Sequence, residues 1–180
     1  MVNNDIPILI ERTEPTDNSE RILIRHMAES DLDVVTDLWM KLIEEHAVND
    51  QVYFASFRNN RNRKRRHLEI ILRDSFEHAW VAVHRDCVIG FCSAFVSYTE
   101  SMYNRRTEAT LGDIYVEPAY RSRGVGSLLL RETMEWAKLM EADDLRLHVH
   151  SANRDAIAYY EGRGFKHVFQ VMSLSICQTL

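Results

Sequence analysis

The segment from Arg121 to Gly126 has residue types that bind a phosphate, and it stands where a strand pattern gives way to a helix pattern. Backbone N–H groups in the first turn of a helix have no acceptor inside that helix, and the helix dipole adds partial positive charge there. Gly124 and Gly126 leave room for phosphate oxygens beside the main chain, and arginines add charged donors. The spacing therefore predicts a diphosphate site formed by Arg121, Ser122, Arg123, Gly124, Val125, Gly126 and Ser127.

The context of these glycines decides between two interpretations of them. An isolated Gly-x-Gly is more often a plain turn before a helix than a binding site. Here a strand pattern over Thr107–Val116 and the stop at Pro118 precede the glycines. An amphipathic helix pattern then runs from Val125 to about Glu141, so we favour the phosphate site.

Further downstream, Asn153 and Tyr160 lie two turns apart on an expected short helix, so both side chains face the same side. Tyr159 lies about 100° further round that helix. We expect the Tyr159 ring to pack into the core with its hydroxyl at the surface. The pair Asn153 and Tyr160 is therefore the second candidate for chemistry.

The elements that must position these residues follow from the hydrophobic pattern. It predicts one α/β domain over residues 21–180 after a loosely held tail at residues 1–20. The expected strands are Arg21–Arg25, Ala79–His84, Val88–Tyr98, Thr107–Val116, Leu145–His150 and Phe165–Ile176. The expected helices are one capped by Ser30, then Arg61–Phe76, Val125–Glu141 and Asn153–Glu161. This order predicts a mixed sheet covered by helices.

Together these features resemble the GNAT superfamily of N-acetyltransferases, whose Arg/Gln-x-x-Gly-x-Gly/Ala motif follows a strand of this kind. Arg121, Gly124 and Gly126 occupy the matching positions. The resemblance implies a single mixed, mostly antiparallel sheet flanked by helices. It also implies transfer of acetyl from acetyl-CoA to a primary amine, with no metal, on a small-molecule or protein acceptor. A homodimer is the oligomeric state that the resemblance suggests.

The resemblance also implies a mechanism. The strands that hold Gly112–Val116 and Leu145–His150 would separate and admit the pantetheine arm, which would bind main-chain groups at Tyr115 and Val116. An amine would attack the thioester directly, with a backbone N–H near Val116 stabilising the oxyanion. Asn153 would begin the helix beside the pantetheine arm, and Tyr160 would give its proton to the departing thiolate.

The base that removes a proton from the amine is not given by the motif. Many members of the superfamily carry a Glu in this strand, whereas this chain has Gly112 just before Asp113. We take Asp113 as the candidate base, with Glu108 and Glu117 as alternatives, acting directly or through water. Each of these carboxylates could equally be a strand-end charge that faces solvent. A non-catalytic acyl-CoA-binding or sensor module of the same fold is therefore the alternative function.

Composition limits the possible partners. Hydrophobic residues make up 46% of the 180 residues, and the formal net charge of -5 argues against a general nucleic-acid binder. The basic segment Arg58–Arg66 is either a solvated helix face or part of the acceptor cleft, where it would favour acidic acceptors.

No apolar run is long enough for a membrane span, and the first ten residues lack the pattern of a signal peptide, so we expect a cytoplasmic protein without a membrane partner. Cys87, Cys92 and Cys177 lack metal-site spacing and are expected to be buried free thiols. His148 and His150 alternate on an expected strand, and a solvated sheet face is favoured there over a metal site.

Overall fold

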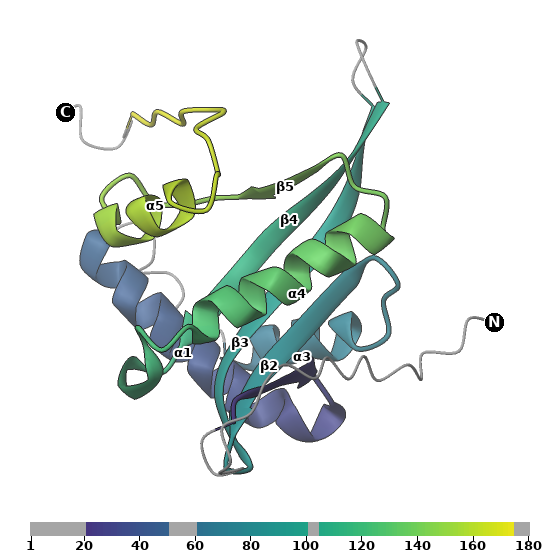
Figure 1. Ribbon diagram of the computed structural model, residues 1–180, viewed down its shortest axis with the longest axis vertical. Coiled ribbons are helices and arrows are strands. Elements are labelled where there is room, and N and C mark those ends of the chain that lie inside the picture. Colours follow the sequence, from purple (N-terminus) through teal and green to yellow (C-terminus); the bar gives the residue numbers. More distant parts are fainter. Residues whose placement is uncertain (1–20, 51–60, 101–104, 175–180) are drawn as a thin grey trace. The chain divides into compact units, whose positions relative to one another are not determined.

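The computed structural model describes residues 21–50, 61–100 and 105–174. The chain forms two compact units, divided between Leu147 and His148. Within the described residues, the first unit holds the sheet and helices α1, α3 and α4, whose bounds follow below, and the second holds helix α5 (Arg154–Glu161) (Figure 1).

The sheet of the first unit has, within the described residues, five strands in the order β1-β2-β3-β4-β5. They are β1 (Leu23–His26), β2 (Glu77–His84), β3 (Cys87–Glu100), β4 (Arg105–Val116) and β5 (Asp144–Leu147). Every neighbouring pair is antiparallel except β4 and β5, which are parallel. The expectation of a mixed, mostly antiparallel sheet flanked by helices is confirmed.

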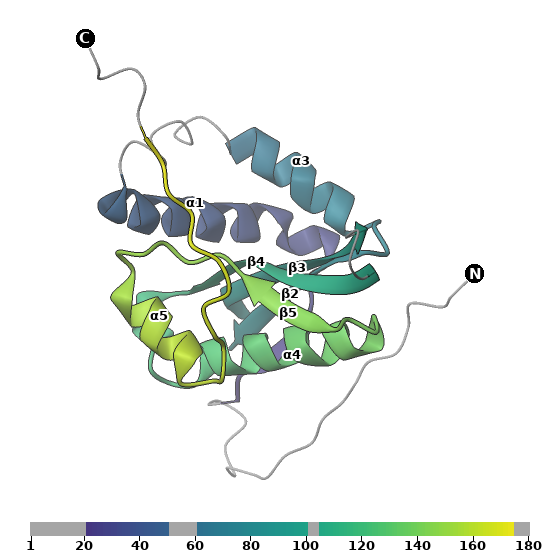
Figure 2. The same ribbon diagram turned by 90° about the horizontal axis from the view of Figure 1, so that it is seen from above.

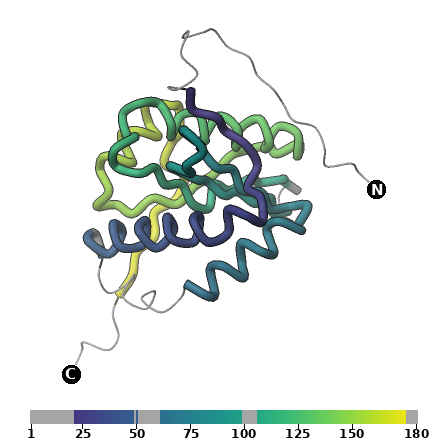
Figure 3. The backbone as a smooth tube through the Cα atoms, turned by 90° about the horizontal axis from the view of Figure 1, so that it is seen from below, coloured from purple at the N-terminus to yellow at the C-terminus, as the bar shows by residue number. Residues whose placement is uncertain are grey.

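Helices cover both faces of this sheet. Helices α1 (Leu32–Asn49) and α3 (Arg61–Ile71) lie on one face, and α4 (Val125–Leu139) lies on the other (Figure 2). Figure 3 shows α1 and α3 as neighbours on the same side. Side chains of β2 to β4 on the α1/α3 face of the sheet are therefore covered by these two helices.

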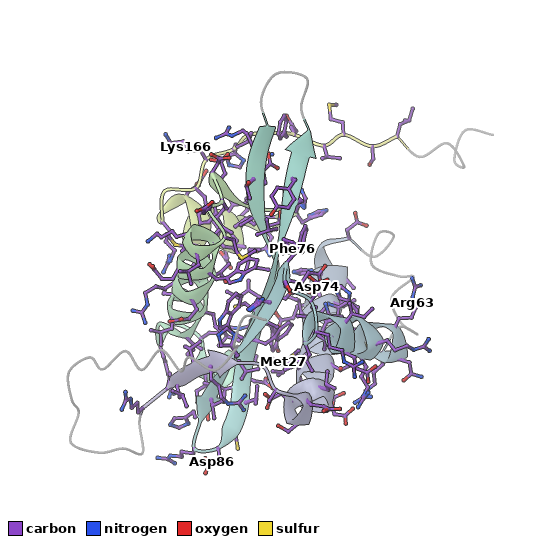
Figure 4. All side chains as sticks on the ribbon, turned by 90° about the vertical axis from the view of Figure 1, so that its right-hand side faces the viewer. Met27, Arg63, Asp74, Phe76, Asp86 and Lys166 are labelled. Carbon is purple, nitrogen blue, oxygen red and sulfur yellow. The ribbon has the colours of Figure 1, made fainter. Side chains whose placement is uncertain are left out.

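The core between the sheet and the α1/α3 layer is apolar. It includes Val35 of α1, Leu68 of α3, Val81 of β2 and Phe91 of β3, which are all fully buried. Met27, labelled in Figure 4, belongs to the same core. Each such side chain stabilises the fold by about 1.5 to 3 kcal/mol. This packing fixes α3 against the strands that carry the residues discussed below.

Several predicted boundaries differ from the structure near the chain's first helices. Ser30 does not cap a helix, because it lies inside a short 3₁₀ turn, η1 (Glu29–Asp31). The carboxylate of Asp31 accepts the Ala28 N–H at 2.8 Å and binds Arg25 at 2.5 Å. Burial raises the pKa of Asp31, but the hydrogen bonds from Arg25 and Ala28 outweigh it and leave that pKa below its usual value. Asp31 is therefore the residue that fixes the entry to α1.

Helix α3 ends at Ile71, earlier than the predicted Phe76. The carboxylate of Asp74 accepts the Phe76 N–H at 2.6 Å, and the Phe76 carbonyl accepts the Val96 N–H at 2.8 Å. An Asp that bonds the backbone two residues on forms a turn that competes with the helix. The chain therefore turns into β2 here.

The predicted strand Phe165–Ile176 is wrong over residues 165–174, which contain no strand; residues 175 and 176 lie outside the described part. Its apolar side chains Val168, Val171, Met172 and Leu174 are exposed. A residue favours a strand mainly because its side chain packs against neighbouring strands on a half-buried sheet. An alternating apolar pattern alone therefore does not form a strand where no neighbouring strand pairs with it. Strand β5 likewise ends at Leu147, so His148 and His150 do not share a strand face.

Candidate active site

Strand β4 carries a bulge at the position where the sequence lacks the expected acid. Ser93 of β3 pairs with Asp113, and the next residue, Ala94, pairs with Leu111, so Gly112 is the extra residue. A Cβ atom on Gly112 would lie 3.3 Å from Ser93 Oγ, closer than most such contacts. Bulges bend a strand and re-aim its side chains. Here the bulge sets the direction of Asp113.

Asp113 is held by three donors. Its Oδ2 accepts a hydrogen bond from Lys64 Nζ at 2.6 Å and one from Ser93 Oγ at 3.3 Å. Its Oδ1 accepts the Trp39 indole N–H at 3.3 Å. The Lys64 side chain is 8% exposed and that of Asp113 is 22% exposed. Asp113 is therefore part of a largely buried ion pair rather than a charge that faces solvent.

The other two carboxylates considered as bases are also paired. Glu117 binds Lys41 of α1 at 2.5 Å, and Glu108 binds Arg146 of β5 at 2.8 Å. These contacts tie β4 to the elements on either side of it. Neither carboxylate lines the cavity described below.

Three cations of the basic segment are paired with acids. Arg61 binds Asp37 at 2.9 Å, and Arg65 binds Asp33 at 3.1 Å and also Glu69. Arg63 extends from the outer side of α3, away from the sheet (Figure 4). Arg58 lies outside the described residues. Acids of α1 thus balance Arg61 and Arg65, Asp113 balances Lys64, and a role of the segment in the acceptor cleft stays a prediction.

A cavity of about 170 Å³ lies between α3 and strands β2 to β4. It is lined by His67, Ile71, Glu77, Ser93, Ala94, Phe95, Gly112 and Asp113. His67 Nε2 lies 3.7 Å from Glu77 Oε2. His67 and Glu77 were not predicted as site residues, because only the strand register brings Glu77 of β2 into one cavity with the β4 bulge.

The predicted phosphate segment has the backbone expected of it. Gly124, with φ of 82°, precedes α4 in the left-handed region, and Ser122 has φ of 61°. The first backbone bond of the helix runs from the Leu128 N–H to the Gly124 carbonyl at 3.0 Å. The amides of Val125 and Gly126 therefore precede this bond, and Ser127 completes the same first turn. Main-chain donors at the start of a helix suit a phosphate.

The arginines of this segment contact neighbouring residues. Arg121 Nε donates to the Val116 carbonyl at 2.9 Å, and its terminal nitrogen binds Glu45 of α1 at 2.6 Å. Its guanidinium also lies over the Tyr115 ring, 5.3 Å from the centroid. Arg123 lies over the Tyr120 ring at 5.6 Å. Arg121 thus links the end of β4, the phosphate segment and α1.

At the end of β4, the edge that faces β5 carries main-chain N–H and C=O groups that are not paired with β5. The last pair with β5 joins Leu111 to Leu147, and β4 continues beyond it to Val116. Within the described residues, no strand pairs with this edge of β4 after Leu111. Tyr115 is buried in the core, and burial, followed by the nearby charges of Glu45 and Glu117, raises its pKa.

In the second unit, Asn153 caps α5, since its side chain accepts the Ala156 N–H at 3.2 Å. Tyr160 is half-buried, and its ring packs against Tyr159 at 5.3 Å and Phe165 at 5.5 Å. Asn153 thus begins the helix as expected, and the proton-donor role of Tyr160 stays a prediction.

Comparison with known proteins assigns the family. The family model described as "Acetyltransferase (GNAT) family" matches residues 39–165, which span all the strands from β2 to β5 and the phosphate segment. The chain belongs to the GNAT acetyltransferase family. The suspected resemblance is thereby confirmed.

Individual acetyltransferases resemble parts of the chain. Streptothricin acetyltransferase of Streptomyces lavendulae is 34% identical over 92 residues, which cover 51% of this chain but 46% of that protein. Thialysine N-epsilon-acetyltransferase of Bos taurus is 28% identical over 156 residues, covering 79% of this chain and 83% of that protein. The solved structure of aminoglycoside N-acetyltransferase AAC(6')-Iy in complex with CoA has a TM-score of 0.71 to this chain and 18% sequence identity. The match covers 86% of this chain and 94% of that protein. At that identity the structural likeness shows the fold alone.

The described residues contain no group of three or more His, Cys, Asp or Glu side chains placed to hold a metal ion. No helix in that part of the chain is both long and apolar enough to cross a bilayer. Cys92 is buried, which raises its pKa to about 12, whereas Cys87 is exposed, contrary to expectation; Cys177 lies outside the described residues.

Proposed function

We propose that this GNAT protein transfers the acetyl group of acetyl-CoA to a primary amine by direct attack in a ternary complex. One observation carries the proposal. After Leu111, β4 has an edge that β5 does not pair with. The chain then passes through a 3₁₀ turn, η3 (Pro118–Tyr120), to the left-handed turn at Gly124 and the first amides of α4. An extended pantetheine arm and a diphosphate need these two features in this order. The named acetyltransferase relatives support the same reaction.

The residues have the following proposed roles. The diphosphate binds the first turn of α4, with Arg121 and Arg123 as charged donors. The pantetheine arm binds main-chain groups at Tyr115 and Val116, and Asn153 is a further proposed cofactor residue. Tyr160 protonates the departing thiolate. Asp113 is the base that the sequence suggests, although three donors already occupy its carboxylate.

The proposed acceptor is a small molecule or a protein that carries a primary amine. Three of the described cations of the basic segment are balanced by acids, and the cavity beside the bulge is lined by Glu77 and Asp113. A cationic small-molecule amine therefore suits this cavity better than the acidic acceptor expected from the basic segment. A cytoplasmic location and a homodimer complete the proposal, and cell fractionation and light scattering test them.

The deciding experiment is a panel of amines incubated with acetyl-CoA, with detection of released thiol. Amine-dependent release supports the transferase. Tight acetyl-CoA binding without release with any amine would favour the non-catalytic acyl-CoA-binding module instead. The panel should contain simple diamines, aminoglycosides and a lysine-containing peptide, so that it covers both acceptor classes.

A further inference from the structure

The proton acceptor for the attacking amine is unassigned by the family motif in this chain. An alkylammonium has a pKa of about 10.4 and must lose a proton before it can attack a thioester. Position 112 is a glycine, and Lys64, Trp39 and Ser93 already donate to Asp113. Besides Asp113, the residues that line the cavity and can take up a proton are His67 and Glu77.

The geometry of His67 and Glu77 suits a bound ammonium. Their Nε2 and Oε2 atoms are 3.7 Å apart, which is too long for a hydrogen bond between them. The same separation lets one nitrogen atom lie within about 3 Å of both. The side chains are 49% and 29% exposed, so a ligand can reach them. The two residues therefore frame a position for one amine nitrogen.

Charge around this position favours a cation. His67 shares its cavity with Glu77 of β2 and Asp113 of β4, Asp113 binds Lys64 of α3, and Arg63 lies one turn earlier than His67 on α3. Lys64 and Asp113 balance each other at 2.6 Å. Arg63 extends outward from the surface of α3 (Figure 4). Glu77 is thus the carboxylate left for a ligand's ammonium.

We propose that His67 and Glu77 receive the acceptor amine and that His67 takes its proton. Glu77 accepts one N–H of the ammonium, and a second N–H bond breaks as its proton passes to Nε2 of His67. The nitrogen lone pair then forms a bond to the acetyl carbonyl carbon, and the nitrogen loses its remaining extra proton to water. The C–S bond breaks, and CoA leaves as a thiolate that takes a proton from an acid. Imidazole exchanges protons near neutral pH, which suits this step. The inference rests on the proposed function.

The test compares His67→Gln and Glu77→Gln with wild type, using the best acceptor among 1,4-diaminobutane, an aminoglycoside and a lysine-containing peptide. Arg66→Gln, an exposed neighbour on the same helix, is the control. For His67→Gln we expect kcat/KM to fall about 100-fold at pH 7. This defect should shrink towards pH 10, where the amine loses its proton unaided. For Glu77→Gln we expect KM to rise about tenfold, the effect of one charge-assisted hydrogen bond, with a smaller change in kcat.

Several outcomes would overturn the inference. A His67→Gln defect that does not change with pH, or that is no larger than the Arg66→Gln effect, removes the proton role. A pH-dependent defect in Asp113→Asn but not in His67→Gln assigns the role to Asp113. If no amine in the panel releases thiol from wild type although acetyl-CoA binds, the proposed function fails too. Wild-type turnover with unaffected His67 and Glu77 variants would defeat this inference alone. Acetyl-CoA affinity and thermal melting of each variant check that it is folded.

Discussion

The phosphate segment at residues 121–127 and the cavity beside Gly112 are built in different ways. The phosphate segment is continuous in sequence, and its proposed function depends on backbone conformation at Gly124 and on the first turn of one helix. The cavity draws on α3 and three strands, and its ion pair joins Lys64 to Asp113, far apart in the sequence. A site made by local backbone can be predicted from a motif, whereas a site made by strand register and helix packing requires the fold.

The largest expected effect belongs to a residue found by local spacing. Tyr160→Phe should lower kcat by about 10² to 10⁴, the range for loss of a general acid, and leave acetyl-CoA affinity nearly unchanged. Steady-state kinetics with thiol detection measure it. Tyr159→Phe is the matched control, because Tyr159 is the adjacent tyrosine of α5 and is also half-buried. Equal small effects of both changes would make Tyr160 a packing residue.

A second change tests the phosphate segment itself. Gly126→Glu places a side chain and a negative charge in the first turn of α4, where the diphosphate is proposed to bind. Loss of two charge-assisted contacts of about 1.5 kcal/mol each weakens acetyl-CoA binding about 100-fold. Calorimetry on the folded variant provides the measurement. The cavity variant Ser93→Ala should bind acetyl-CoA normally, and unchanged affinity in Gly126→Glu would contradict the assignment.

The difference between the local phosphate segment and the cavity built from several elements explains which parts of the structure could be predicted from the sequence. The α4 pattern and the strand before it were local, so the start of α4 after Gly124 and the sheet type were predicted correctly. The role of Lys64 was missed because it stands in a run of basic residues, although it shares one face of α3 with the buried Leu68 and Ile71. That spacing was the available signal. The bulge at Gly112 and the partners of Glu77 depend on pairing between strands, which one sequence does not specify.

A third change tests the ion pair at the cavity beside Gly112 through the free energy of unfolding. Lys64→Met removes the cation beside Asp113 and leaves a largely buried carboxylate without its partner. Breaking a buried pair costs about 3 to 5 kcal/mol, and partial exposure of Asp113 lowers the expected loss to about 2 to 3 kcal/mol. Urea unfolding measures it. The double variant Lys64→Met, Asp113→Asn should recover part of the loss, because no unpaired charge remains. No recovery would mean that Lys64 stabilises α3 by packing rather than by charge.

The smallest expected effect lies where α1 contacts the phosphate segment. Glu45 binds the terminal nitrogen of Arg121 at 2.6 Å, and a diphosphate would compete with Glu45 for that guanidinium. Both side chains are 43% exposed, so the pair is worth at most about 1 kcal/mol. Glu45→Gln should therefore tighten acetyl-CoA binding by up to about fivefold, and the gain should decrease as salt screens the charges. Titration calorimetry at low and high salt measures both.

Glu44→Gln, the exposed neighbour on α1, removes the same charge without touching Arg121 and should change little. Weaker binding in Glu45→Gln would show instead that Glu45 holds Arg121 in position for the phosphate, so that α1 would contribute to cofactor binding as a support rather than as a competitor.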